Sequence, residues 1–481
     1  MTASGFQRTE AMRRQIRKEP AMNRTAEHET MDPYRLKLHL TPPAGWLNDP
    51  NGLCQYQGTY HAFYQYVPGD ALGRGKKCWG HAVSSDLIHW RDEGIFLEPD
   101  RPFDRDGVYS GCAWTDENGI HLFYTGNVKE AGDYDYIREG RRAAQILVET
   151  KDGKEAGEKR LLLTNKDYPE DCTLHVRDPK VWKEGGIYHM VLGARKNNDQ
   201  GAAILYESSD LTAWKYAGEM TSEIPFGYMW ECPDCFEMEG TAFLSFCPQG
   251  LPRGEFENQN IYQSGYVRLE EGMSRPQTVK TASFTEWDKG FDFYAPQTFA
   301  DEKGRRILIG WMGLPDIAEE YGNPTVASGW QHALTLPREI TYRAGRLCQM
   351  PVEELKLLRR NERNVETGET SVLSGGICEI EIDQIEAGSC RICFNRDLVL
   401  DCRDGVFTME FLNRTGAGRT VRRAEIDGLE DLRIIMDTSA VEVYVNHGST
   451  VFTSRYYPEP GKSSVVIDCE KSRNRLWDLG C

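Results

Sequence analysis

Residues 60–66 read Tyr60-His-Ala-Phe-Tyr-Gln-Tyr66, a short aromatic and aliphatic run, and similar runs recur along the chain. The four later copies are His121-Leu-Phe-Tyr124, Tyr188-His-Met-Val-Leu192, Ala242-Phe-Leu-Ser-Phe246 and Arg306-Ile-Leu-Ile-Gly310. Their starts are 61, 67, 54 and 64 residues apart. Short runs of this kind, bounded by Gly, Asp, Asn and Pro, are typical of β-strands, and repetition at a similar spacing indicates a repeat architecture. The five copies predict an all-β fold, a five-bladed β-propeller with four strands in each blade.

A second repeat agrees with the first. Ser84-Ser-Asp-Leu-Ile-His-Trp90 and Ser208-Ser-Asp-Leu-Thr-Ala-Trp214 share the pattern Ser-Ser-Asp-Leu-x-x-Trp. Each follows the aromatic run of its own unit, so the first and third units should contain the same turn.

The repeat stops after Leu336-Pro-Arg-Glu339, and a different pattern begins. Ile377-Cys-Glu-Ile-Glu-Ile382 and Val441-Glu-Val-Tyr-Val445 alternate as half-buried antiparallel strands do. These runs predict a C-terminal β-sandwich appended to the propeller. The N-terminal segment shows little apolar periodicity. The expected domains are a flexible leader at 1–33, the propeller at 34–340, a linker at 341–349 and the sandwich at 350–481.

The composition excludes several classes of function. Lys and Arg number 57 against 74 Asp and Glu, which gives a formal net charge of −17 and a pI of about 5.2. Nucleic-acid binding needs clustered Lys and Arg, and anionic membranes attract basic surfaces. We therefore expect neither nucleic acid nor a membrane as a partner. With no apolar stretch of ~18 residues and no secretion signal, the sequence predicts a cytoplasmic protein.

Fourteen cysteines are scattered along the chain, mostly singly. In a reducing compartment this usage predicts buried free thiols and no structural disulfides. Cys232-Pro-Asp-Cys235 and Cys390-Arg-Ile-Cys393 have the spacing of a zinc knuckle or a redox pair. They fall in different expected domains, so structural thiols are favoured over zinc, and no metal or cofactor is expected.

Polar residues occupy equivalent places ahead of the aromatic runs. Asp49, Ser110 and Glu231 lie 11 residues before theirs, Asp178 lies 10 before, and the fifth unit has Tyr294-Ala-Pro-Gln297 there. If each aromatic run is the second strand of a blade, these residues lie on the innermost strands and face one axial pocket. Three carboxylates there suit glycosidic cleavage by a proton donor and a nucleophile. A calcium or magnesium site is the competing interpretation, and a purely structural role the least favoured.

The neighbouring residues favour a sugar ligand. Aromatic rings stack on the apolar face of a sugar, and Trp46 and Trp230 lie next to the carboxylates in sequence. Asn48, Gln65 and Arg177 can bond its hydroxyl groups.

Three boxes resemble the signatures of glycoside hydrolase family 32, the β-fructofuranosidases. They are Trp46-Leu-Asn-Asp-Pro-Asn-Gly52, Arg177-Asp-Pro179 and Glu231-Cys-Pro-Asp234. Four further segments match between or after them, namely Phe63-Tyr-Gln-Tyr66, Trp79-Gly-His81, Tyr109-Ser-Gly111 and Tyr294-Ala-Pro-Gln297. The resemblance extends from about Tyr34 to the C-terminus and likewise implies a five-bladed propeller.

The resemblance implies a role for each matching residue. Asp49 would be the nucleophile, Glu231 the general acid/base, and Asp178 a carboxylate that binds fructosyl hydroxyls and that Arg177 should keep ionised. The implied substrate-binding residues are Asn48, Gln65, Trp79, Ser110, Arg177, Tyr294 and Trp311. Retention of configuration would need Asp49 and Glu231 about 5–5.5 Å apart.

The leaving group is less determined by the sequence. Arg74, Lys76 and Lys77 form a local basic cluster that could bind a sugar phosphate, with solvated loop side chains as the alternative. The expected activity is retaining hydrolysis of sucrose 6-phosphate or sucrose, without a cofactor. An exo-acting fructan or difructoside hydrolase is the alternative, and a non-catalytic sugar-binding propeller a remote one. The sandwich is expected either to support the propeller or to mediate homo-oligomer formation.

Overall fold

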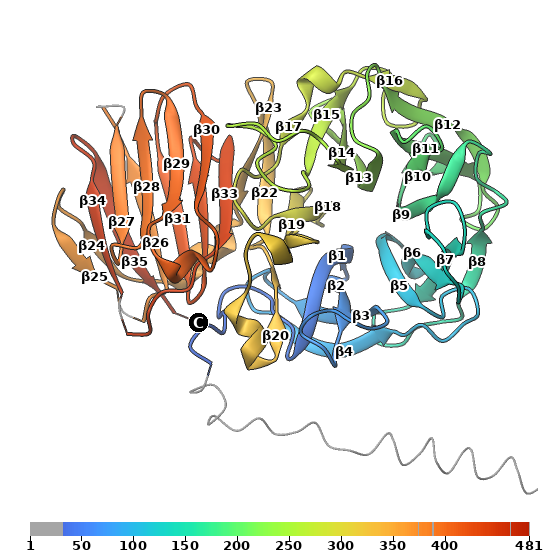
Figure 1. Ribbon diagram of the computed structural model, residues 1–481, viewed down its shortest axis with the longest axis horizontal. Helices are drawn as coiled ribbons and strands as arrows, with labels where there is room; N and C mark the ends of the chain where they lie inside the picture. Colours follow the sequence, from blue (N-terminus) through green and yellow to red (C-terminus); the bar gives the residue numbers. More distant parts are fainter. Residues whose placement is uncertain (1–31, 374, 387–388, 462, 481) are drawn as a thin grey trace, which may run out of the picture.

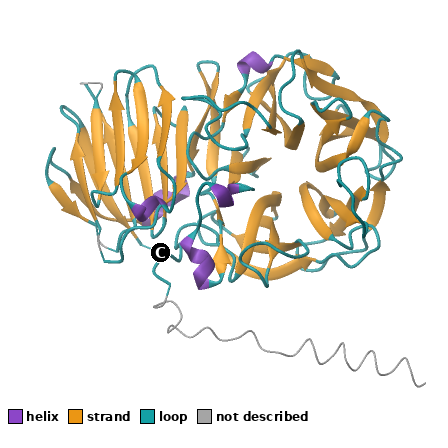
Figure 2. Ribbon diagram, in the orientation of Figure 1, coloured by secondary structure: helices purple, strands orange, loops and turns teal. Residues whose placement is uncertain are grey.

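The computed structural model describes residues 32–480 except 374, 387–388 and 462. The expected leader therefore lies outside the described residues, apart from Asp32 and Pro33. Five small sheets stand in a ring, and two larger sheets stack face to face beside them (Figure 1). Strands dominate the described chain, with only short helical turns between them (Figure 2). The prediction of a propeller followed by a β-sandwich is confirmed.

The four main strands of each blade pair antiparallel, and the first of them lies nearest the axis. Blades 1 and 2 comprise β1 (Gly45–Tyr56), β2 (Thr59–Val67), β3 (Cys78–Ser84) and β4 (Arg91–Leu97), then β5 (Gly107–Asp116), β6 (Gly119–Lys129), β7 (Arg141–Thr150) and β8 (Arg160–Leu163). Blade 3 comprises β9 (Cys172–Glu184), β10 (Ile187–Lys196), β11 (Gly201–Ser208), β12 (Lys215–Ser222) and β16 (Gln277–Val279). Blade 4 comprises β13 (Met229–Met238), β14 (Thr241–Gln249), β15 (Gly265–Leu269) and β17 (Thr285–Glu286). Blade 5 comprises β18 (Tyr294–Ala300), β19 (Arg306–Met312), β21 (Ala333–Leu334), β22 (Arg338–Arg343) and β23 (Arg346–Pro351).

The five first strands form a closed ring of contacts in the order β1, β5, β9, β13, β18 and back to β1. The aromatic runs are the second strands β2, β6, β10, β14 and β19, as the repeat predicts. The strand β20 (Trp330–Gln331) closes the ring by pairing in parallel with the start of β1. Because residues 330–331 come from the end of the propeller sequence, this pairing joins its last part to its first.

The Ser-Ser-Asp-Leu-x-x-Trp repeat forms the same turn twice, after β3 and after β11. Asp86 accepts backbone N–H bonds from the second and third residues after it at 3.0 and 2.8 Å, and Asp210 does so at 2.9 and 2.9 Å. The two Leu residues have φ of 67° and 66°. Each closing Trp donates its indole N–H to the carbonyl of that Leu.

The expected linker at 341–349 forms instead most of the hairpin β22–β23, the outer part of blade 5. Ala344 and Gly345 make its two-residue turn, both with positive φ (48° and 80°). Such a turn matches the twist of a hairpin, so Ala-Gly here marks a turn inside a blade. The chain crosses to the sandwich through η5 (Glu353–Leu358). The other short helical turns are η2 (Thr281–Ser283), η3 (Ile317–Glu319), η4 (Pro324–Ser328) and η6 (Arg414–Gly416).

The sandwich consists of two six-stranded sheets around an apolar core. One sheet contains β24 (Arg359–Asn364), β35 (Arg473–Leu479), β26 (Cys378–Asp383), β31 (Leu432–Asp437), β32 (Ala440–Val445) and β33 (Thr450–Arg455). The other contains β25 (Thr370–Val372), β34 (Ser464–Asp468), β27 (Cys390–Phe394), β28 (Leu398–Arg403), β29 (Val406–Phe411) and β30 (Val421–Glu425).

Buried ion pairs join the sandwich to the propeller. Glu442 on β32 binds Arg338 of blade 5 and also His39, which precedes β1. The sandwich therefore braces the propeller, which is one of the two roles expected for it. Among the described residues, no helix is long and apolar enough to cross a membrane.

Candidate active site

All five innermost strands break their pairing register at the same place. The breaks lie at Asp49-Pro50, Ser110-Gly111, Asp178-Pro179, Cys232-Pro233 and Ala295-Pro296. A bulge turns a side chain away from the regular alternation of the strand, and proline fits there because it has no N–H to donate to the ladder. Asp178, Cys232 and Ala295 take positive φ values of 64°, 47° and 45°. The fold holds this uncommon backbone shape to direct side chains toward the axis.

The bulges define two sets of equivalent residues. The bulge ring is the residue directly before each proline or glycine, and the flanking ring is the residue before that. The bulge ring contains Asp49, Ser110, Asp178, Cys232 and Ala295, and the flanking ring contains Asn48, Tyr109, Arg177, Glu231 and Tyr294. The sequence spacing treated Glu231 as equivalent to Asp49 and Asp178, but Cys232 occupies that place. The spacing was one residue out because β1 has a second bulge, between Asn51 and Cys54, which adds one residue between Asp49 and the aromatic run.

A directed chain of hydrogen bonds holds Asp49. Asn48 Nδ2 donates to Asp49 Oδ1 (3.0 Å) and to Gln65 Oε1 (2.7 Å). Gln65 Nε2 donates to Ser110 Oγ (2.6 Å), whose hydroxyl donates to Asp49 Oδ2. Burial raises the pKa of Asp49, and the bonds from Ser110 and Asn48 oppose this. The arrangement fixes one carboxylate in a defined orientation.

Three donors surround the carboxylate of Glu231. Arg177 Nη2 donates to Oε1 at 2.6 Å, and Tyr294 OH and Gln249 Nε2 donate to Oε2 at 2.7 and 2.6 Å. Gln249 was missed in the sequence, because it lies at the far end of β14 and no box contains it. Its only signal is the antiparallel pairing, in which the end of β14 lies beside the start of β13.

Asp178 lies between the other two carboxylates. The backbone N–H of Cys232 donates to its Oδ2 at 3.0 Å. The Sγ atom of Cys232 lies 3.8 Å from Asp49 Oδ2 and 3.7 Å from Asp178 Oδ2. Arg177 Nε is 3.8 Å from Asp178, farther than the 2.6 Å between Arg177 and Glu231. Burial raises the pKa of Asp178 to about 7 although Arg177 opposes it. Arg177 favours the ionised form of Asp178, as expected, but burial outweighs it, and the guanidinium lies closer to Glu231.

The predicted tryptophans have different surroundings. Trp79 is fully buried in the core between blades 1 and 2, and its indole N–H donates to the Tyr109 carbonyl at 3.0 Å. Its ring therefore supports the pocket wall from behind. Trp311 packs edge-on against Trp46 with ring centroids 5.9 Å apart. Its indole nitrogen has no hydrogen-bond partner among the described residues.

The basic cluster predicted for a phosphate does not converge. Arg74 is exposed and paired with Asp70 at 2.7 Å, and Lys76 is exposed. Lys77 leans inward, with Nζ 4.9 Å from the centre of the Trp46 ring. Burial lowers the pKa of Lys77 to about 8, and Asp49 opposes this shift.

The axial carboxylates are held by protein donors. Among the described residues, a different group of three side chains has ligand atoms close enough to hold a metal ion, namely Glu430, Asp431 and His447 at the sandwich surface. Neither Cys-x-x-Cys pair belongs to such a group.

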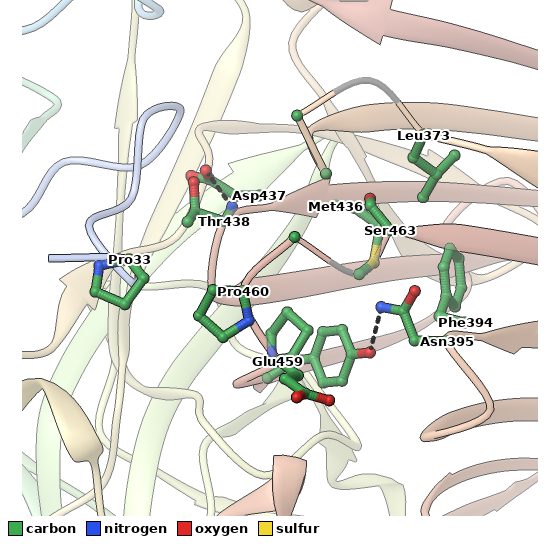
Figure 3. Close-up of a pocket in the computed structure, with 15 residues that line it drawn as sticks. Pro33, Leu373, Phe394, Asn395, Met436, Asp437, Thr438, Glu459, Pro460 and Ser463 are labelled. Carbon is green, nitrogen blue, oxygen red and sulfur yellow. Dashed lines mark hydrogen bonds between the residues drawn. The ribbon is translucent and has the colours of Figure 1, made fainter. Parts of the chain in front are cut away.

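A separate cavity of about 340 Å³ lies in the sandwich, and Pro33 is one of the residues that line it (Figure 3). Pro460, Phe394, Met436 and Leu373 give it an apolar lining. It contains none of the axial carboxylates.

Comparisons with known proteins match both domains of the chain. Residues 39–351 match the model of the glycosyl hydrolases family 32 N-terminal domain, and residues 391–474 match that of the family 32 C-terminal domain. A sucrose-6-phosphate hydrolase of Bacillus subtilis is 38% identical over 470 residues, which cover 94% of this chain and 93% of that protein. One from Klebsiella pneumoniae is 40% identical over 443 residues, with 89% of each chain covered. The solved structure of the Lactobacillus gasseri sucrose-6-phosphate hydrolase superposes with a TM-score of 0.86 at 29% identity, covering 94% of this chain and 95% of that one.

Proposed function

Because the chain belongs to glycosyl hydrolase family 32, we propose that it is a retaining β-fructofuranosidase that hydrolyses sucrose 6-phosphate or sucrose. The names of the relatives above support the substrate. Phosphorylated sugars are charged and do not cross membranes. We therefore place the reaction in the cytoplasm.

Asp49 is the nucleophile in this proposal. Breaking the bond at the fructosyl anomeric carbon builds positive charge on the ring, and an ionised carboxylate on one face stabilises it before bonding to that carbon. The donors Asn48 and Ser110 support this role because they orient both oxygens of Asp49.

Glu231 is the general acid/base. It gives its proton to the glycosidic oxygen as the bond to the anomeric carbon breaks. It then takes a proton from the water that attacks the fructosyl–Asp49 ester, which releases fructose and restores both carboxyl groups. Tyr294, Gln249 and Arg177 orient Glu231 between the two steps.

Asp178 binds fructosyl hydroxyl groups without reacting. With its pKa raised to about 7 by burial, it is partly protonated at neutral pH and can accept or donate a hydrogen bond. Its 3.8 Å contact with Arg177 and the 3.7 Å contact with Cys232 fix its position.

The observation that carries the proposal is that two shared neighbours, Cys232 and Arg177, connect the three carboxylates. Cys232 contacts both Asp49 and Asp178, and Arg177 contacts both Asp178 and Glu231. Carboxyl groups gathered in one pocket are what glycoside hydrolysis uses.

The test is to measure kcat/KM of the purified protein on sucrose 6-phosphate, sucrose and short inulin, since specificity is the ratio of these values. We expect the two sucrose forms to be cleaved to fructose and glucose or glucose 6-phosphate, well ahead of inulin. Inulin as the best substrate would replace the proposal with a fructan hydrolase. No cleavage of any of the three would reject it.

A further inference from the structure

Two cations face each other at the rim of blade 2. Lys129 ends β6 and Arg141 begins β7, and the two are direct cross-strand partners. Like charges in directly opposed positions destabilise a sheet. Burial lowers the pKa of Arg141, and the nearby Arg177 lowers it further. Placing two repelling cations opposite each other at the edge of the pocket costs stability, so we expect a functional reason for the pair.

Nearby carboxylates act on this pair only from a distance: the charge of Asp106 raises the pKa of Lys129 and that of Glu231 raises the pKa of Arg141, but burial outweighs both. Among the described residues, neither Lys129 nor Arg141 makes an ion pair, and Arg141 Nε is buried without a hydrogen-bond partner. The two nearby acids already have other partners. Asp106 accepts from Arg105 at 3.2 Å, and Glu130 lies 2.7 Å from Arg105 and 2.7 Å from Arg142. Arg141 therefore lacks an ion-pair partner among the described residues.

His175 can accept a hydrogen bond from only one of Arg141 and Arg177. Its Nε2 atom lies 3.0 Å from Arg141 Nη1 and 3.0 Å from the Tyr136 carbonyl, and its Nδ1 atom lies 3.0 Å from Arg177 Nη1. Burial, with the charges of Arg177 and Arg141, lowers the pKa of His175 to about 2, so the ring is neutral and carries one N–H. If Nε2–H donates to Tyr136, it faces an N–H of Arg141. In the other tautomer, Nδ1–H faces Arg177. One arginine N–H lacks an acceptor in both cases.

The position of Arg141 relates it to the leaving group. Glu231, Arg177, His175 and Arg141 form a continuous chain of contacts of 2.6, 3.0 and 3.0 Å. The acid/base contacts the glycosidic oxygen, so the leaving sugar extends from Glu231 toward the pocket rim. Arg141 lies on blade 2 and Glu231 on blade 4, with Arg177 of blade 3 between them.

We infer that Arg141, with Lys129 beside it, binds the phosphate of the leaving sugar, an inference that rests on the proposed function. A phosphate dianion would give Arg141 the acceptors it lacks and would relieve its repulsion with Lys129. Arginine suits this role because its planar fork matches phosphate oxygens. The site differs from the cluster of Arg74, Lys76 and Lys77 that the sequence indicates. There Arg74 is already paired, and Lys77 lies on the nucleophile side of the pocket.

The test compares Arg141→Gln with the matched control Arg142→Gln. Arg142 is the next residue on β7, and its charge is already paired with Glu130. For each variant, kcat/KM is measured on sucrose 6-phosphate and on sucrose, and the inhibition constant is measured for glucose 6-phosphate and glucose. We expect Arg141→Gln to lower kcat/KM on sucrose 6-phosphate by ~10–100-fold, as loss of a charged hydrogen bond does. Its kcat/KM on sucrose should change less than about threefold.

The same variant should weaken glucose 6-phosphate inhibition by a similar factor and leave glucose inhibition unchanged. Lys129→Gln should give a smaller loss, also confined to the phosphorylated sugars. Arg142→Gln should behave as wild type. Equal losses of Arg141→Gln on both substrates would overturn the inference, because they indicate a positioning role through His175. A selective loss in Lys77→Gln alone would move the phosphate to blade 1.

The wild-type protein separates the two proposals. If it cleaves sucrose and sucrose 6-phosphate equally well, the phosphate subsite is rejected and the proposed hydrolysis stands. If it cleaves neither sugar, the proposed function itself is rejected.

Discussion

Glu442 at the seam between propeller and sandwich and Asp178 in the axial pocket are both buried carboxylates, yet their pKa values shift in opposite directions. At the seam, His39 binds Asp437 at 2.8 Å and Glu442 at 2.9 Å, and Arg338 binds Glu442 at 2.8 Å. Burial alone would raise the pKa of Glu442, but Arg338 and His39 lower it to about 2. In the pocket, burial raises the pKa of Asp178 to about 7.

The difference lies in how many cations each carboxylate has. Glu442 contacts two cations, His39 and Arg338, although Asp437 and Asp288 also bind them. Asp178 and Glu231 share the single cation Arg177. Burial by itself therefore does not decide whether a carboxylate stays ionised. Glu442 is compensated by its cations, whereas Asp178 in the pocket is left under-compensated, which suits a site that must exchange protons and bind a cationic transition state.

The largest expected effect is on catalysis. Asp49→Asn keeps the shape of the side chain but removes the nucleophile, so turnover of sucrose 6-phosphate should fall by about 10,000-fold or more. The melting temperature should stay the same or rise, since a buried carboxylate with a raised pKa is removed. Steady-state kinetics and thermal melts measure both. A variant that keeps a tenth of the activity would refute the assignment.

At the seam the same type of change should act on stability. Glu442→Gln leaves His39 and Arg338 buried without their shared anion, and breaking a buried pair costs about 3–5 kcal/mol. Urea unfolding measures the loss, with Glu410→Gln on the exposed side of β29 as the control. The activity of the remaining folded protein should be unchanged. An unaltered unfolding midpoint would mean that the seam does not stabilise the fold.

The seam also predicts a pH dependence. Burial would lower the pKa of His39, but the bonds to Asp437 and Glu442 raise it from 6.5 to about 9. A raised histidine pKa stabilises the fold fully below pH ~6.5, and this contribution disappears as the pH rises through about 9. The gap in unfolding free energy between wild type and His39→Gln should therefore narrow by up to about 3 kcal/mol between pH 6 and 10. If the difference in unfolding free energy stayed constant with pH, His39 would not be protonated in the folded protein.

Much of the fold was predictable, because each blade repeats one aromatic second strand and one bulged first strand. Asp49, Asp178 and Glu231 were identified because they lie in short boxes. The second bulge of β1 hid the one-residue difference between Glu231 and Cys232. Gln249 and Arg141 could not be found either, since their neighbours come from other strands and blades. Such contacts depend on register and packing, which local sequence does not encode.

The smallest expected effect is on the stability of the protein, through Asp178 in the axial pocket, and does not depend on catalysis. The raised pKa of Asp178 means that the folded state binds more protons than the unfolded chain between about pH 4 and 7, so stability falls as the pH rises through that window. Asp178→Asn should therefore be more stable than wild type by about 1–3 kcal/mol at pH 8 and similar to it near pH 4. Urea unfolding at both pH values measures the difference. If the unfolding free energies of the two proteins changed with pH in parallel, Asp178 would be ionised as freely as a surface carboxylate.

The most direct test of the central claim is the stereochemistry of transfer to methanol. With sucrose 6-phosphate in aqueous methanol, attack on the fructosyl–Asp49 ester should form methyl β-D-fructofuranoside, which does not change anomer and can be read by NMR. The account predicts the β anomer from wild type and no product from Asp49→Asn. Formation of the α anomer would mean a single displacement with inversion, in which Asp49 could act as a base but not as a nucleophile.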